Sequence, residues 1–121
     1  MDKITIFIWL IFTHFIVDWI FQTHFQAMNK TKNIKALLIH SLIYTLGFII
    51  PFYIFNINFI WLILLFITHA VIDHRKILIW ITKTIRGMTE ENTPEWLRAL
   101  IIITIDQVFH LLFLWIIILN I

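Results

Sequence analysis

Residues 96–119 read WLRALIIITIDQVFHLLFLWIIIL, an apolar run interrupted near its middle by Asp106 and His110. The run is long enough to cross a bilayer as a helix, because about 20 apolar residues span the hydrocarbon core. A charged side chain inside such a span is costly and calls for a compensating partner or a function. This stretch therefore predicts a transmembrane helix that contributes an acid and an imidazole to a buried polar site.

The rest of the chain shares this apolar character. Of its 121 residues 61% are hydrophobic, which exceeds the roughly 45–50% that is usual in a soluble domain. Further apolar segments cover residues 4–25, 36–55 and 59–81, and each reaches the length of a membrane span. We therefore expect an all-α fold, with residues 1–121 forming a single transmembrane domain built as an integral membrane four-helix transmembrane bundle.

Basic residues gather in two of the loops between these segments. They are Lys30, Lys32 and Lys35 in the first loop, and Arg75, Lys76, Lys83, Arg86 and Arg98 around the last. The opposite side carries only Asp2 and Lys3. Because basic loops stay in the cytoplasm, we expect a multi-pass protein of the cell (inner, cytoplasmic) membrane with both termini outside. The net charge of +2 does not indicate nucleic-acid binding.

Acidic residues inside the apolar segments are paired with histidines. Three of the seven acids lie there, each four positions from a histidine. Side chains four apart share one helix face, so each pair forms a local edge with two possible metal ligands. The pairs are His14 with Asp18, His69 with Asp73, and Asp106 with His110, and the neighbouring polar positions are Gln22, His40, Tyr44, Lys76 and Gln107.

These polar positions fall at one depth in the predicted bundle. At a rise of about 1.5 Å per residue, Asp18, Asp73 and Asp106 lie roughly 10–15 Å from the cytoplasmic helix ends. The aspartate precedes its histidine only in the fourth segment, which runs antiparallel to the first and third. We therefore expect one shared site in the cytoplasmic half of the bundle.

The side chains at this site favour metal chemistry. Imidazole and carboxylate are common ligands of Zn, Mn and Fe, and helical bundles build metal centres from inward-facing pairs. The chain has no cysteine, and its single serine lacks an elbow motif, which disfavours nucleophilic catalysis by either. We predict a divalent metal ion (Zn, Mn or Fe) on His14, His40, His69 and His110. Asp18, Asp73 and Asp106 are the candidate catalytic residues, and the candidate substrate-binding residues are Gln22, Tyr44, Lys76 and Gln107.

The same residues form an ordered set of short motifs. The set comprises HFIVDWIFQ at residues 14–22, Lys30, His40-x-x-x-Tyr44, Thr68-His69-x-x-x-Asp73-x-x-Lys76 and Asp106-Gln107-x-x-His110. In this order the motifs resemble the small bacterial and phage integral membrane proteins grouped as domain of unknown function family 3307, over nearly the whole chain. The family carries no established activity. Its membrane His and Asp motifs are distantly similar to those of proteins labelled membrane-bound metal-dependent hydrolases.

Three functions are compatible with a buried His/Asp cluster. The leading hypothesis is a metal-dependent membrane enzyme, hydrolytic in type, that acts on a lipid or lipid-linked substrate from the cytoplasmic side. The alternative is a proton- or ion-conducting or transport subunit, because buried His and Asp chains also form ion pathways. Four helices would then require a homo-oligomer. The third is an interaction protein whose polar cluster only fixes the register of its helices.

Overall fold

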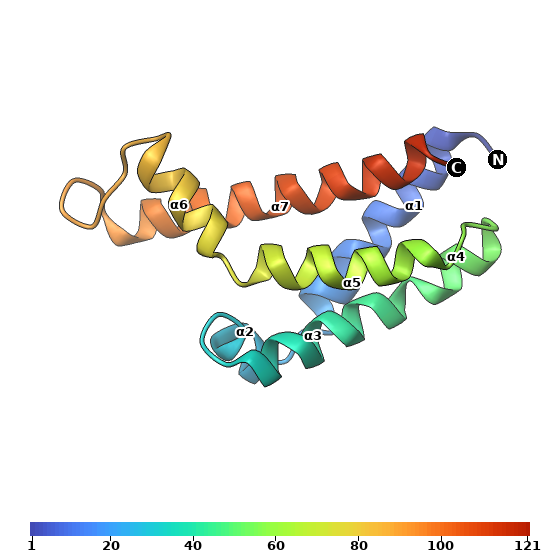
Figure 1. The fold of residues 1–121 in the computed structure, drawn as a ribbon, viewed down its shortest axis with the longest axis horizontal. Helices are drawn as coiled ribbons and strands as arrows, with labels where there is room; N and C mark the ends of the chain where they lie inside the picture. Colours follow the sequence, from blue (N-terminus) through green and yellow to red (C-terminus); the bar gives the residue numbers. More distant parts are fainter.

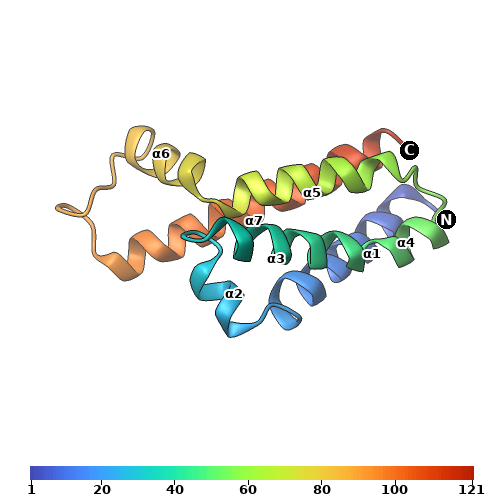
Figure 2. The same cartoon turned by 60° about the horizontal axis from the view of Figure 1, so that its bottom comes forward.

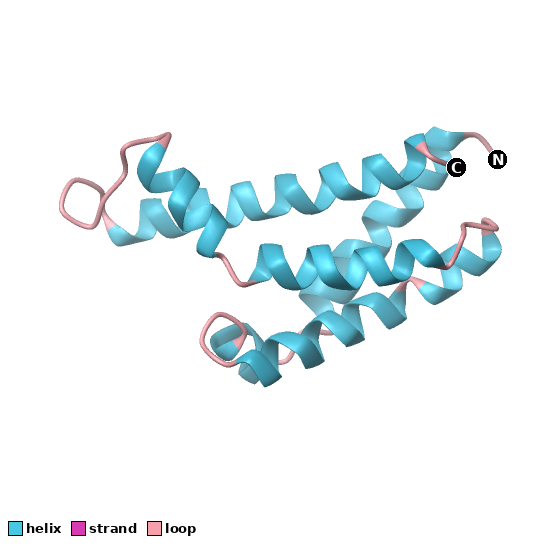
Figure 3. Cartoon of the chain, in the orientation of Figure 1, coloured by secondary structure: helices cyan, strands magenta, loops and turns pink.

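The computed structural model describes residues 1–121 and contains only helices and loops (Figure 3). This confirms the predicted all-α fold. The helices, in chain order, are α1 (Lys3–Phe15), the π-helix η1 (Ile16–Ile20), α2 (His24–Asn29), α3 (Ile34–Gly47), α4 (Ile49–Ile54), α5 (Ile60–Asp73), α6 (Lys76–Thr84) and α7 (Glu95–Leu119).

The helices α1, α3, α5 and α7 run lengthwise beside one another, with η1 continuing α1 and α4 continuing α3 (Figure 1 and Figure 2). α3 packs against α5, α5 against α7, and α7 against α1. Both termini and α4 lie at one end of the molecule (Figure 1). α2, α6 and the loop before α7 lie toward the other end, so the two ends differ in structure.

Three helical stretches are long and apolar enough to cross a membrane: Lys3–Ile20, Ile34–Ile54 and Glu95–Leu119. α5 is also apolar but has only 14 residues. Large aliphatic and aromatic side chains such as Trp9 and Leu112 are exposed along these helices. Apolar surface on this scale is unusual in a soluble monomer. The helices therefore indicate a membrane protein.

The first predicted segment, residues 4–25, is divided in the structure. α1 begins after Asp2, whose side chain accepts hydrogen bonds from the backbone N–H and the hydroxyl of Thr5. These bonds lower the pKa of the Asp2 carboxyl. After η1 the chain turns, and Thr23 and Gln26 form a capping box that starts α2. Because a capping box satisfies the free N–H groups of a new helix, α2 departs from the line of α1 and packs on α3.

The third predicted segment, residues 59–81, is divided as well. α5 ends at Asp73, and α6 begins at Lys76, after Arg75 with a φ of 63°. A left-handed residue ends a right-handed helix because the chain cannot continue in the same direction. The structure thus corrects the prediction of one helix over residues 59–81. α6 is a separate helix that packs against α7.

The second and fourth predicted segments agree more closely with the structure. Residues 36–55 correspond to α3 and α4, and residues 96–119 correspond to α7. At the end of α3, a Cβ atom on Gly47 would lie only 2.4 Å from Cγ2 of Val17. Glycine at this position therefore lets α3 approach η1 closely, and that approach brings Asp18 of η1 beside α3.

Buried side chains separate into two groups along the molecule. The apolar core contains 11 residues, among them Leu10, Phe48, Phe52 and Leu114, on the parts of the helices nearest the termini. Buried histidines and aspartates lie further along the same helices, toward α2 and α6. The polar region is thus bounded on one side by closely packed apolar side chains.

Candidate metal centre

The structure brings the predicted histidines and aspartates together in one cluster. α1 and η1 supply His14 and Asp18, α3 supplies His40, α5 supplies His69 and Asp73, and α7 supplies Asp106 and His110. All seven are buried, with exposed fractions of 3% or less. The spacing of four residues turns both members of each pair inward, which is why the pairs meet between the helices.

Four donor atoms of this cluster lie close together between η1, α3 and α5, and we call them the four-atom donor set. They are Oδ1 of Asp18, Nε2 of His40, Nε2 of His69 and Oδ2 of Asp73. Nε2 of His40 lies 3.0 Å from Oδ1 of Asp18 and 3.0 Å from Oδ2 of Asp73. Nε2 of His69 lies 3.1 Å from Nε2 of His40. The same His69 atom lies 3.3 Å from Oδ2 of Asp73 and 3.8 Å from Oδ1 of Asp18. A tetrahedron with bonds of about 2.0 Å has edges of about 3.3 Å, and these five distances of 3.0–3.8 Å are close to that value.

A chain of hydrogen bonds orients His69. Nδ1 of His69 lies 2.8 Å from Nε2 of His110, and Nδ1 of His110 lies 2.9 Å from the backbone oxygen of Asp106. A carbonyl oxygen only accepts, so Nδ1 of His110 carries the proton and its Nε2 accepts the N–H of His69. The lone pair on Nε2 of His69 then faces the other three atoms of the donor set. Metal-binding histidines are commonly fixed through their second nitrogen in this way.

Two carboxylate oxygens on the other side of the cluster have no hydrogen-bond partner. They are Oδ1 of Asp73 and Oδ1 of Asp106, and with His110 their residues form a second group of close donor atoms. Nε2 of His110 lies 3.6 Å from Oδ1 of Asp73, but its lone pair already accepts the bond from His69. The hydrogen-bond pattern therefore fits one metal ion in the four-atom donor set better than two ions.

His14 has a different role in the cluster. Its Nδ1 accepts a hydrogen bond from the hydroxyl of Tyr44 at 2.9 Å, and its Nε2 donates to Oε1 of Gln107 at 2.9 Å. Gln107 in turn donates to Oδ2 of Asp106. Tyr44 also stacks on the ring of His69, with 3.6 Å between ring centroids. His14 was predicted as a metal ligand, but the structure leaves it outside both groups of close donor atoms.

Lys30 reaches the cluster although its sequence position suggested only an orienting charge. Its Nζ donates to Oδ2 of Asp73 at 2.8 Å, and the residue is 5% exposed. Lys76, predicted to bind substrate, is instead exposed at the start of α6. Lys30 comes into place because α2 folds back after η1. The sequence signal for that turn is the capping-box pair Thr23 and Gln26.

The formal charges of the cluster do not cancel. If the histidines are neutral and the three aspartates are ionised, the aspartates contribute −3 and Lys30 contributes +1, which leaves −2. Uncompensated charge is expensive in a buried site. A divalent cation would bring the sum to zero. The charge of the cluster and the geometry of the donor set therefore point to the same kind of ion.

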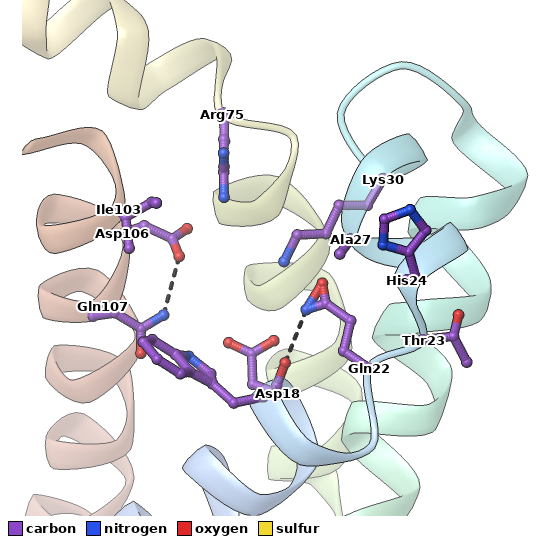
Figure 4. Close-up of a pocket in the computed structure, with 11 residues that line it drawn as sticks. Asp18, Gln22, Thr23, His24, Ala27, Lys30, Arg75, Ile103, Asp106 and Gln107 are labelled. Atoms are coloured by element: carbon purple, nitrogen blue, oxygen red, sulfur yellow. Dashed lines mark hydrogen bonds between the residues drawn. The ribbon is translucent and has the colours of Figure 1, made fainter. Parts of the chain in front are cut away.

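A pocket of about 300 Å³ opens beside the cluster (Figure 4). Four predicted site residues line it, with Gln22 donating to the backbone oxygen of Asp18 and Gln107 bonded to Asp106. The wall also contains basic groups that the sequence did not assign to the site, namely His24, Lys30 and Arg75. No pattern in the sequence marks Arg75, because its position depends on the break between α5 and α6.

The fold and the site together define a class: an all-helical membrane protein with a buried His/Asp cluster that could hold a metal ion. The chain belongs to the family described as Protein of unknown function (DUF3307), whose model matches residues 6–121. This match confirms the resemblance indicated by the motifs. No curated protein and no solved structure matches the chain.

Proposed function

We propose that α1–η1, α3–α4, α5 and α7 form a four-helix transmembrane bundle in the cell (inner, cytoplasmic) membrane. Exposed apolar side chains on α5 support this, since Ile63 and Ile67 are 57% and 51% exposed. At 1.5 Å per residue α5 is only about 21 Å long, so the bilayer would be thinner around it. Lysines lie near α2 and α6, which supports a cytoplasmic location for that end and an outside location for both termini.

We propose further that the protein is a metal-dependent membrane enzyme, hydrolytic in type, acting on a lipid or lipid-linked substrate. The observation that carries this proposal is the buried four-atom donor set of Asp18, His40, His69 and Asp73, with its near-tetrahedral spacing. A divalent ion held there by four protein atoms would activate a water molecule or polarise a substrate oxygen by taking that oxygen as a fifth ligand. The adjoining pocket gives a substrate direct access to the cluster.

Five further polar residues have a proposed part in hydrolysis. Asp106 is the general base, because its Oδ1 is unpaired and its side chain lines the pocket. The water oxygen forms a bond to the phosphorus or carbonyl carbon while the bond to the leaving oxygen breaks. Asp106 accepts the proton from water and transfers it to that leaving oxygen. Gln22 and Gln107 present amide groups to substrate oxygens, and His14 with Tyr44 positions the base through Gln107.

A proton- or ion-conducting subunit is the second candidate. The hydrogen-bonded series of His110, His69 and His40 favours it, because such series can move protons. However, the path would have to continue toward the termini through side chains such as Leu10, Phe48 and Leu114, which are fully buried and apolar. A polar site that is closed on one side supports an enzyme more strongly than a conductor.

Metal analysis of the purified protein tests the proposed enzyme. Purified without chelator, the wild type should contain about one equivalent of Zn, Mn or Fe. The double variant His40→Ala/His69→Ala should lose the metal, and His74→Gln should keep it because His74 lies outside both donor groups. Added Zn or Mn should also raise the melting temperature of chelator-treated wild type. A metal-free wild type with no thermal shift on adding either ion would disprove the metal centre.

A further inference from the structure

Arg75 occupies a backbone position that usually belongs to another residue type. The chain has positive φ at Asn56 (54°), Arg75 (63°) and Gly87 (65°). Gly and Asn tolerate this left-handed conformation best, and one of them usually follows the end of a helix. Arg75 adopts it between α5 and α6, one residue beyond His74, at a steric cost. Strained positions of this kind cluster at functional sites.

The side chain of Arg75 has no partner that explains the strain. It takes part in none of the ion pairs, which join Lys30 to Asp73 and Arg98 to Glu90 among others. Its Nε is buried and lacks a hydrogen-bond partner. A guanidinium offers five N–H donors in a flat fork that matches a phosphate or carboxylate. Arg75 thus presents donors that nothing in the protein uses.

The guanidinium points into the pocket beside the cluster. In Figure 4, Arg75 enters from above, with Asp106 of α7 on one side and Lys30, which follows α2, on the other, and Asp18 lies below. Basic groups therefore occupy one part of the wall and carboxylates another. Of these carboxylates, Asp18 belongs to the donor set that would bind the proposed metal ion. An anion between that ion and Arg75 would then meet positive charge on both sides.

We propose that this pocket binds the phosphate group of a ligand, with Arg75 as its principal anchor. The inference rests on the proposed function in one respect, because a bound cation offsets the repulsion from Asp18 and Asp106. The ligand class is a phosphomonoester or phosphodiester. The phosphate can come from a lipid headgroup or from free phosphate, and both sources share the chemistry that Arg75 recognises.

An apolar groove on the same π-helix bears on the source of the phosphate. Val17 and Phe21 line this groove of about 540 Å³, while Asp18 and Gln22 line the pocket. Val17 and Asp18 are successive residues of η1 and point in different directions, so the groove and the pocket lie on different faces of η1. A lipid could place its phosphate in the pocket and an acyl chain in the groove. Free phosphate would use the pocket alone.

Thermal shifts of the full chain in detergent test the phosphate subsite. The ligands are dioctanoyl phosphatidic acid, inorganic phosphate and neutral dioctanoylglycerol, and bound metal is measured in every sample. The variants are Arg75→Gly, which suits the left-handed backbone, and Arg98→Gln as a control outside the pocket. Arg75→Gly should melt no lower than wild type without ligand, because glycine relieves the strain. Arg75→Asn provides a second variant that the same backbone accepts.

Phosphatidic acid should stabilise the wild type and Arg98→Gln. In Arg75→Gly its half-maximal concentration should rise about ten- to a hundredfold, as expected from the loss of charge-assisted hydrogen bonds. Phosphatidic acid should act at lower concentration than inorganic phosphate, and equal potency would overturn the lipid source. Equal responses of wild type and both Arg75 variants would overturn the subsite even if metal is bound. Arg75-dependent binding without any bound metal would leave the subsite standing and remove the proposed enzyme.

Discussion

Nζ of Lys30 lies 2.8 Å from Oδ2 of Asp73, and that oxygen also faces Nε2 of His40 and of His69. The lysine and a metal ion in the donor set would therefore bind the same carboxylate. Each would neutralise part of its charge, and both would hold its orientation. Lys30 is the C-cap residue of α2. The folding of α2 therefore places a lysine against a carboxylate of the candidate metal centre.

Replacing Lys30 by Met should destabilise the metal-free protein by about 3–5 kcal/mol, because Asp73 would stay buried without its cation. Zinc or manganese should restore more stability to this variant than to wild type, since the buried charge would become −3 instead of −2. Unfolding in mixed micelles with increasing dodecyl sulfate measures both effects. The double variant Lys30→Met/Asp73→Asn is the control and should recover part of the loss. Equal losses in the single and double variants would contradict the pairing.

Replacing His110 by Leu should weaken metal binding about 10–100-fold, because His69 would lose the partner that fixes its tautomer. His110→Gln should retain more affinity, since its side-chain oxygen can still accept the N–H of His69. Competition against a chelator of known affinity measures both values. Complete loss of metal in His110→Gln would instead identify His110 as a direct ligand.

Most residues of the candidate site could be predicted, because each aspartate lies four positions from a histidine on the same helix. His14 with Asp18, His69 with Asp73, and Asp106 with His110 each repeat at the helical spacing, so helical geometry alone turns them toward one layer. These polar side chains lie inside apolar segments, so each needs a polar partner, and the nearest partners are the other side chains of this set. The structure brings these pairs together between the helices.

The basic residues of the site were not predictable in the same way. Lys30 and Arg75 reach it only because the chain turns where η1 and α5 end. Such turns depend on the backbone conformation of single residues. The capping pair Thr23 and Gln26 is the sequence signal for the first of these turns. The second break falls at an arginine, where helix-ending rules expect Gly or Asn. Composition and hydropathy reveal neither turn, since both turns fall inside the apolar segments 4–25 and 59–81.

Replacing Gly47 by Val should destabilise the protein by about 1–3 kcal/mol through overpacking. The first added carbon would already lie 2.4 Å from Cγ2 of Val17, so α3 and η1 would have to move apart. Val17→Ala should restore much of the loss when combined with Gly47→Val, because it removes the opposing methyl groups. Thermal unfolding of the single and double variants measures this coupling. Additive losses in the double variant would show that the two residues do not touch.

Replacing Asp106 by Asn should lower hydrolysis about 10²–10⁴-fold, the range expected when a general base is lost. Metal content should stay near that of wild type, because Asp106 lies outside the four-atom donor set. Release of inorganic phosphate from dioctanoyl phosphatidic acid measures the rate, and elemental analysis measures the metal. If Asp106→Asn loses its metal together with its activity, Asp106 is a ligand and the base must be another residue.

Proteoliposomes containing the wild-type protein should show no more proton flux than empty liposomes. The buried polar side chains end at His14 and Tyr44, which are hydrogen-bonded to each other, and beyond them Leu10, Phe48 and Leu114 fill the space between the helices toward the termini. Moving a proton across this region would require a charge in an apolar core, which is strongly unfavourable. A pH-sensitive dye inside the vesicles, with a potassium gradient and valinomycin as the driving force, measures the flux. A flux that disappears in Asp73→Asn and persists after chelator treatment would favour the conducting subunit over the enzyme.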